Sequence, residues 1–107
     1  MLIATEVYYS QLAADPDLAE LVDLFIDELP ERLRQLHAAL EQGNRHDLAR
    51  FSHQLKGAGG SYGFPQLTPA AAELELLAKQ AADEPTLRRA LHELVAVAGQ
   101  LRAGLPT

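Results

Sequence analysis

The sequence predicts an all-α fold, an up-and-down antiparallel four-helix bundle with a short N-terminal extension. Three observations indicate this class. Apolar residues recur at helical spacing in four stretches, proline and glycine separate the stretches, and no segment shows the alternating pattern of a convincing strand. At 107 residues, the chain is long enough for one core, and we expect a single domain over residues 1–107.

Composition excludes several classes of function. The chain has no cysteine, so it has neither disulfides nor thiolate metal sites. Its net charge of −6 argues against nucleic acid or an anionic membrane as the main partner. No apolar run approaches the roughly 18 residues of a membrane span. Residues 1–4 lack the basic start of a signal peptide, and we expect a cytoplasmic protein.

The chain begins with residues 1–14, an irregular or short helical lead-in that we expect to lie against the bundle. Asp15-Pro16-Asp17 then marks the start of a helix over about residues 16–42, with a capping aspartate and proline at the first helical position. The apolar stripe keeps its phase across Pro30, which predicts one kinked helix and not two. The stripe consists of Leu18, Leu21, Val22, Phe25, Leu29, Leu33, Leu36 and Leu40.

Three further helices follow, over about residues 45–62, 68–82 and 85–103. Asn44, Thr68-Pro69 and Asp83-Glu84-Pro85 mark their starts. In the third helix, Glu73, Glu75 and Lys79 are expected to face mostly outward. The expected inward positions are Leu48, Ser52, Leu55, Gly59 and Tyr62 in the second helix, Leu74, Leu77, Ala78 and Ala81 in the third, and Leu87, Leu91, Leu94, Ala98, Leu101 and Leu105 in the last.

The most informative stretch is residues 51–64, in the second helix. Glycine costs roughly 1 kcal/mol against alanine inside a helix, so a cluster of glycines here requires a reason. His53, Lys56, Gly57 and Gly60 fall at helical spacing on one face. We interpret this face as a surface where the His53 imidazole lies beside glycines without side chains, which leaves room for a second protein.

Two catalytic interpretations of this stretch are disfavoured. The segment from Gly59 to Gly63 matches the G-x-S-x-G motif around Ser61, but that motif works on a strand-to-helix turn and here a helix precedes it. The glycines also fail as a phosphate loop, because Lys56 precedes them. Hydrolysis would require that Ser61 lie on a strand-to-helix turn and that a histidine lie within reach of it.

A metal site built from the four histidines is also disfavoured. His46 and His53 are seven residues apart, about 10 Å along a helix, which is too far to bind one ion together. The sequence therefore predicts no metal site.

A phosphoryl-accepting histidine fits the stretch better. A neutral imidazole is a competent nucleophile toward phosphorus and needs no adjacent base. It needs exposure, a partner that delivers the phosphoryl group, and positive charge for the phosphoryl oxygens. Lys56, one turn after His53, supplies that charge.

The run His53-Gln54-Leu55-Lys56-Gly57-Ala58, with Gly63 ten residues after the histidine, resembles the H-x-L-K-G-[SA] … G signature of histidine-containing phosphotransfer (HPt) domains of bacterial phosphorelays. The flanking segments from Phe25 and from Leu67 resemble the preceding and following helices of that family. The chain departs from the family pattern in extra glycines at positions 59 and 60 and in the bulkier Tyr62.

The resemblance implies a role for each matching residue. His53 would be phosphorylated, on the outer ring nitrogen Nε2, and Lys56 would help to hold the phosphoryl group. Gly57 would provide clearance, and Gly63 would end the helix. The remaining residues expected at the partner surface are Gln54, Gly60 and Arg50.

The implied function is a phosphoryl carrier in two-component signal transduction, not an autonomous kinase. It would accept the group from a receiver-domain aspartyl-phosphate and return it to another receiver of a response regulator or hybrid kinase. The resemblance implies no cofactor of its own, Mg²⁺ on the receiver, and a monomer. The alternative is a non-phosphorylated helical adaptor that binds a receiver or histidine kinase through the same face; an exposed His53 with a free ring nitrogen would disfavour it.

Overall fold

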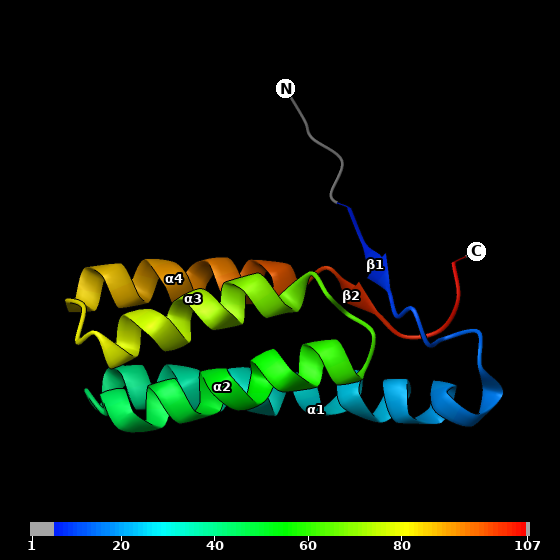
Figure 1. The fold of residues 1–107 in the computed structure, drawn as a ribbon, viewed down its shortest axis with the longest axis horizontal. Helices are drawn as coiled ribbons and strands as arrows, with labels where there is room; N and C mark the ends of the chain where they lie inside the picture. Colours follow the sequence, from blue (N-terminus) through cyan, green and yellow to red (C-terminus); the bar gives the residue numbers. More distant parts are fainter. Residues whose placement is uncertain (1–5, 107) are drawn as a thin grey trace.

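The computed structural model describes residues 6–106, and four antiparallel helices make up most of them (Figure 1). They are α1 (Pro16–Glu41), α2 (Arg45–Ser61), α3 (Leu67–Lys79) and α4 (Glu84–Ala98). The predicted all-α bundle is confirmed. The expectation about a signal peptide concerns residues 1–4, which lie outside the described part of the chain. None of the helices in this part is long and apolar enough to cross a membrane.

Helix α1 is the longest element, and its start follows from local sequence. The Asp15 carboxylate accepts a hydrogen bond from the backbone N–H of Asp17 at 2.9 Å, and Pro16 occupies the first helical position. The helix continues through Pro30 without a break, as the unbroken apolar stripe predicts.

The core lies between the four helices, and one aromatic stack fixes the end of α2 against α1. The rings of Phe25 and Tyr62 stack with centroids 4.8 Å apart, and the centroids of Phe25 and Phe64 are 5.9 Å apart. Most of the predicted inward positions are buried or half-buried. The exceptions are Leu21, which is 46% exposed, Ala81, which is exposed, and Leu105, which is 56% exposed.

The predicted end of the last helix is wrong. Helix α4 stops at Ala98 and not near residue 103, and Leu101–Arg102 forms a short strand, β2. It pairs in parallel with β1 (Tyr8–Tyr9), and the Tyr8 N–H donates to the Gln100 carbonyl at 2.7 Å. The partner strand β1 lies near the start of the chain, and its pairing with β2 takes the place of further helical hydrogen bonds. Leu105 therefore lies outside the helix and outside the core.

The third helix also ends earlier than predicted, at Lys79 and not near residue 82. Ala81 has a φ of +54°, the left-handed conformation that ends a helix, and this conformation exposes its side chain.

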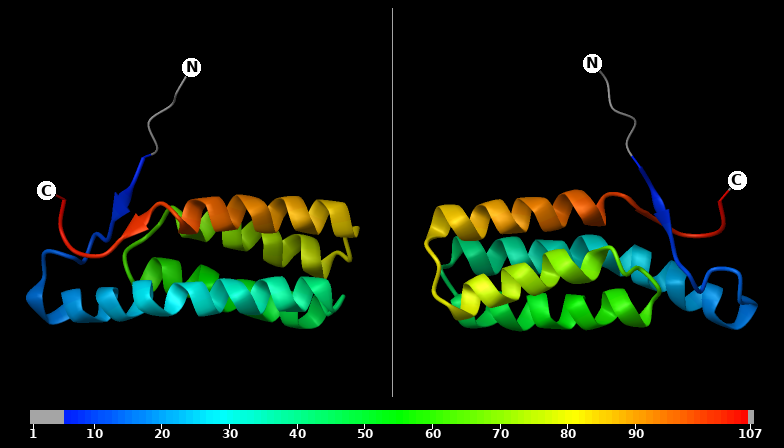
Figure 2. Two further views of the ribbon diagram at one scale, coloured as in Figure 1. Left: turned by 180° about the vertical axis from the view of Figure 1, so that it is seen from behind. Right: turned by 45° about the horizontal axis from the view of Figure 1, so that its top comes forward.

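The lead-in lies against the bundle at the carboxyl end of α2 (Figure 2). The Ser10 hydroxyl donates to the Tyr62 carbonyl at 2.6 Å, and the Gln11 N–H donates to the Gly63 carbonyl at 3.0 Å. Gly63 has a φ of +80°, and a Cβ there would lie 2.5 Å from the Ser10 hydroxyl. Only glycine fits this turn without strain. The N-terminal segment therefore fixes one end of the helix that carries His53.

Candidate functional site

His53 projects from the middle of α2 with 65% of its side chain exposed. Two glycines extend this open surface toward the carboxyl end of the helix, because a Cβ built on Gly57 or on Gly60 would find no atom within 4 Å. Gly59, in contrast, packs against α3, and a Cβ there would lie 3.1 Å from that of Leu67. The structure thus separates two surface glycines from one packing glycine.

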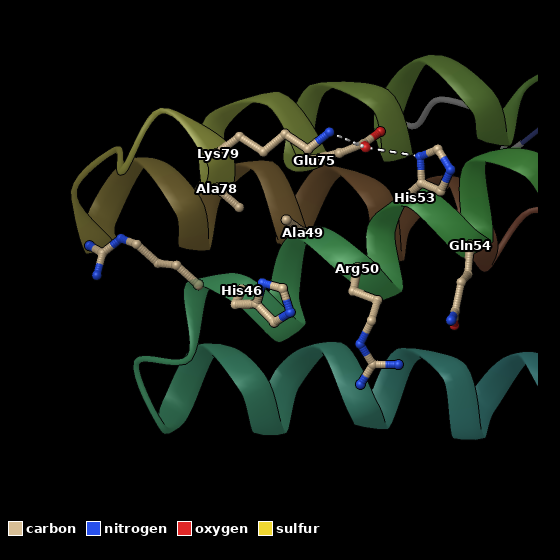
Figure 3. A pocket seen from close by; sticks show the side chains of 9 residues that line it. His46, Ala49, Arg50, His53, Gln54, Glu75, Ala78 and Lys79 are labelled. Carbon is tan, nitrogen blue, oxygen red and sulfur yellow. Dashed lines mark hydrogen bonds and ion pairs between the residues drawn. The ribbon is translucent and has the colours of Figure 1, made fainter.

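The other residues expected at the partner surface also lie on the open side of α2. Gln54 and Arg50 are exposed next to His53 along the helix (Figure 3). Lys56 is only about one third exposed, because its side chain turns toward α3.

Glu75 of α3 is the main residue of this site that sequence reasoning missed. It was expected to face mostly outward, but its side chain is only 6% exposed and points at α2 (Figure 3). Its Oε2 lies 2.9 Å from the His53 Nδ1, and its Oε1 accepts from the Lys56 Nζ at 2.8 Å. Lys79, one turn further along α3, contributes a third contact, with its Nζ 2.9 Å from Oε2.

A signal for this position existed in the sequence. Glu75 is four residues after Ala71 and three before Ala78, and both alanines are buried. Its helical position is therefore at the edge of the buried face. Its charge led to the prediction that Glu75 faces solvent. In the structure the carboxylate is buried and contacts His53 and Lys56 of α2.

These contacts determine the charge of Glu75. Hydrogen bonds from Lys56 and then Lys79 lower the pKa of the Glu75 carboxyl from 4.5 to about 2, against an opposing effect of burial, and the hydrogen bond with His53 lowers it further. The carboxylate is therefore ionised at neutral pH and can only accept hydrogen bonds.

Because Glu75 can only accept, the Nδ1 of His53 must be the donor. In the neutral ring the proton then resides on Nδ1, and the lone pair resides on Nε2. Among residues 6–106, no group forms a hydrogen bond with Nε2. The site therefore presents an exposed, oriented imidazole whose Nε2 carries the free lone pair.

The other histidines are not brought to this site as a cluster. His46 lines a groove beside His53, whereas His37 and His92 line a separate pocket between α1 and α4. In the described part of the chain no group of three or more histidines and carboxylates is placed to hold a metal ion. Ser61 is the last residue of α2 and is not on a strand-to-helix turn.

The fold and this face together define a helical domain whose exposed histidine lies on an open helix surface and not in an enclosed active site. The family model of the Hpt domain matches residues 20–104, from α1 through β2. The chain therefore belongs to the Hpt domain family, the histidine phosphotransfer domains of two-component phosphorelays. Such domains are phosphoryl carriers, not kinases, and interact with receiver domains. No curated protein and no solved structure gives a match.

Proposed function

We propose that this protein is a phosphorelay intermediate in which His53 reversibly accepts a phosphoryl group from the aspartyl-phosphate of a receiver domain and passes it to another receiver. The observation that carries the proposal is the geometry of the ring. Nδ1 is held by an ionised carboxylate, and Nε2 faces outward from an exposed side chain.

The proposed step is an in-line displacement at phosphorus. The Nε2 lone pair forms the N–P bond while the P–O bond to the receiver's aspartate breaks, and its electron pair stays on the aspartate carboxylate. The ring gains positive charge as the bond forms. Glu75, hydrogen-bonded to Nδ1–H, stabilises that charge and keeps the ring orientation fixed.

Lys56 supplies positive charge for the phosphoryl oxygens in this proposal. Its Nζ binds the same carboxylate as His53 and lies one turn along the same helix. The two side chains therefore contact the two oxygens of one carboxylate. The Mg²⁺ ion and the acidic groups of phosphoryl transfer are assigned to the receiver.

The partner surface surrounds His53 on α2. Gly57 and Gly60 provide clearance for the receiver, and Gln54 and Arg50 provide polar contacts. We propose that the protein acts as a monomer. We also propose that it is cytoplasmic, because its receiver partners are expected there.

The alternative is a helical adaptor that binds a receiver or kinase without being phosphorylated. Such a role needs no oriented nucleophile. A buried carboxylate that fixes the tautomer of an exposed histidine favours phosphotransfer over the adaptor.

The test is transfer from a ³²P-labelled receiver, chosen by pairwise profiling against a panel of phosphorylated receivers. We expect the wild type to take label that is lost in acid, as a phosphoramidate is, and His53→Gln to take none. His92→Gln is the matched control, since it removes an exposed histidine of α4 that lies away from the surface around His53, and it should be labelled normally. Label on His53→Gln, or acid-stable label on the wild type, would refute the proposal.

A further inference from the structure

A groove of about 570 Å³ lies between α2 and α3 and borders His53 (Figure 3). Buried small side chains, Ala49 and Ala78, form its bottom. Arg45, Arg50 and Lys79 line it as well. The groove follows α2 toward its amino end, away from the two open glycines.

The charge of this region opposes that of the molecule. The chain carries a net charge of −6, yet four cationic side chains at the groove and beside it meet only two carboxylates. Both carboxylates are already paired. Glu75 binds both lysines of the chain, Lys56 and Lys79. Asp47 lies 3.3 Å from the Arg50 guanidinium, and it also accepts a hydrogen bond from the Asn44 side chain at the amino end of α2.

Within the described residues, Arg45 is the cation of the groove that forms no ion pair. Hydrogen bonds from Thr86 lower the pKa of the Asp83 carboxyl most, and the charge of Arg45 also helps to lower it. The Arg45 guanidinium donates to the Ala82 carbonyl from Nε at 3.3 Å and from Nη2 at 2.9 Å. Among residues 6–106, no carboxylate is close enough to form an ion pair with it. Its positive charge is therefore held in a fixed place by a neutral acceptor.

The far end of the groove is too distant to act on the phosphoryl group. Arg45 precedes His53 by eight residues, which is about 12 Å along a helix. Lys56, in contrast, is only one helical turn from His53. The charge at this end is therefore directed at something larger than the phosphoryl group.

We propose that this groove binds an acidic segment of the receiver domain beside its aspartyl-phosphate. The inference rests on the proposed function, in which a receiver must cover the surface around His53. Positive charge on an otherwise acidic protein attracts and orients such a partner, and it acts mainly on association. The partner surface then has two parts. One is the charged groove on the amino side of His53, and the other is the exposed backbone at Gly57 and Gly60.

The test compares Arg45→Glu with Arg34→Glu in transfer from the receiver selected by profiling. Arg34 is an exposed arginine of α1 that pairs with Glu31 and does not line the groove, so it matches the charge change. We expect Arg45→Glu to raise the receiver concentration needed for half-maximal rate about tenfold at low salt, and the maximal rate to change much less. High salt should shrink the difference, since it screens exposed charges.

Several results would overturn the inference. If the transfer rate depends on receiver concentration equally in the two variants, the groove does not bind the receiver. The phosphotransfer function would still stand if phosphoramidate, a small donor that needs no docking, labels His53. Shifts of the Arg45 and Arg50 amide resonances with inorganic phosphate but not with the receiver would assign the groove to a small anion.

Failure of the proposed function is distinguishable from failure of the groove. If the wild type takes label from neither donor, the function is refuted, and the groove is tested by titrating the unphosphorylated receivers of the same panel. Weaker binding by Arg45→Glu than by Arg34→Glu would then support the acidic partner. Equal affinities, or no binding by any receiver, would refute it.

Discussion

At the scale of single residues, the orientation and tautomer of His53 depend on Glu75. An exposed imidazole on a helix exchanges its proton between two ring nitrogens, and only one of them can face a partner. The ionised carboxylate of Glu75 accepts from Nδ1 and so leaves the outer nitrogen with the lone pair. The same carboxylate holds Lys56, so one buried residue positions both groups that we assign to phosphoryl transfer.

The lowered pKa of Glu75 predicts a pH-dependent contribution to stability. Because the pKa falls from 4.5 to about 2 on folding, the contribution is complete above about pH 4.5 and is lost as the pH falls toward 2. At about 1.4 kcal/mol per pKa unit, it amounts to on the order of 3 kcal/mol. We expect Glu75→Gln to lower the free energy of unfolding at neutral pH and to converge with the wild type near pH 2.

Urea unfolding at a series of pH values measures this effect, and Glu73→Gln, at an exposed position on the same helix, serves as the control. Parallel pH profiles for the wild type and Glu75→Gln would show that the carboxylate contributes nothing through its ionisation.

Gly57 provides a second test at the residue scale. Because a Cβ at this position meets no atom within 4 Å, Gly57→Ala should raise stability by about 1 kcal/mol through helix propensity alone. Gly57→Leu should fold equally well but slow transfer from a receiver at least tenfold, because its side chain would occupy the space that we assign to the partner. Thermal unfolding and transfer kinetics measure the two effects, and normal transfer by Gly57→Leu would contradict the clearance role.

At the scale of elements, the helices were predictable wherever local signals agreed. Capping aspartates, prolines at first turns and apolar stripes place α1 and α2, and with them the open face around His53. The sequence could not show where α4 ends, because Leu101 and Leu105 continue its apolar spacing. The competing partner is Tyr8, more than ninety residues earlier in the chain, and local pattern carries no information about that pairing.

The site was predictable only in part for a similar reason. His53 and Lys56 lie within one helix, so their spacing alone places them together. Glu75 reaches them from α3, and only the packing of the two helices shows that a carboxylate on the edge of the buried face pairs with both.

Pro30 predicts a gain of stability at the element scale. It lies within α1 at an exposed position, where proline removes a backbone hydrogen bond and costs about 3 kcal/mol relative to alanine. We expect Pro30→Ala to raise the free energy of unfolding by about 1–3 kcal/mol. Pro16→Ala, at the first helical position, where proline costs little, is the control. A loss of stability in Pro30→Ala would mean that α1 needs the proline-induced geometry to pack on the core.

At the scale of the whole molecule, the two ends of the chain act on the helix that carries the site. The segment before α1 pairs with the segment after α4 through β1 and β2, and the same segment binds the carboxyl end of α2. At the other end of α2, the Asn44 side chain accepts from the Asp47 N–H at 3.0 Å. The helix that carries His53 is thus fixed at both ends, which suits the transfer to a receiver that we propose.

Ser10 is the residue on which this arrangement depends most. Its buried hydroxyl donates to the Tyr62 carbonyl at 2.6 Å and accepts from the Leu12 N–H at 2.9 Å. Ser10→Ala leaves both backbone groups without a partner, so we expect it to lower the free energy of unfolding by about 1–3 kcal/mol. Ser61→Ala, which removes an exposed hydroxyl from the last residue of α2, should change it by less than about 0.5 kcal/mol. Urea unfolding compares the two variants, and amide hydrogen exchange should show faster opening at Leu12 and at the end of α2 in Ser10→Ala alone. Equal stability and equal exchange in both variants would show that the N-terminal segment rests on the bundle without holding it.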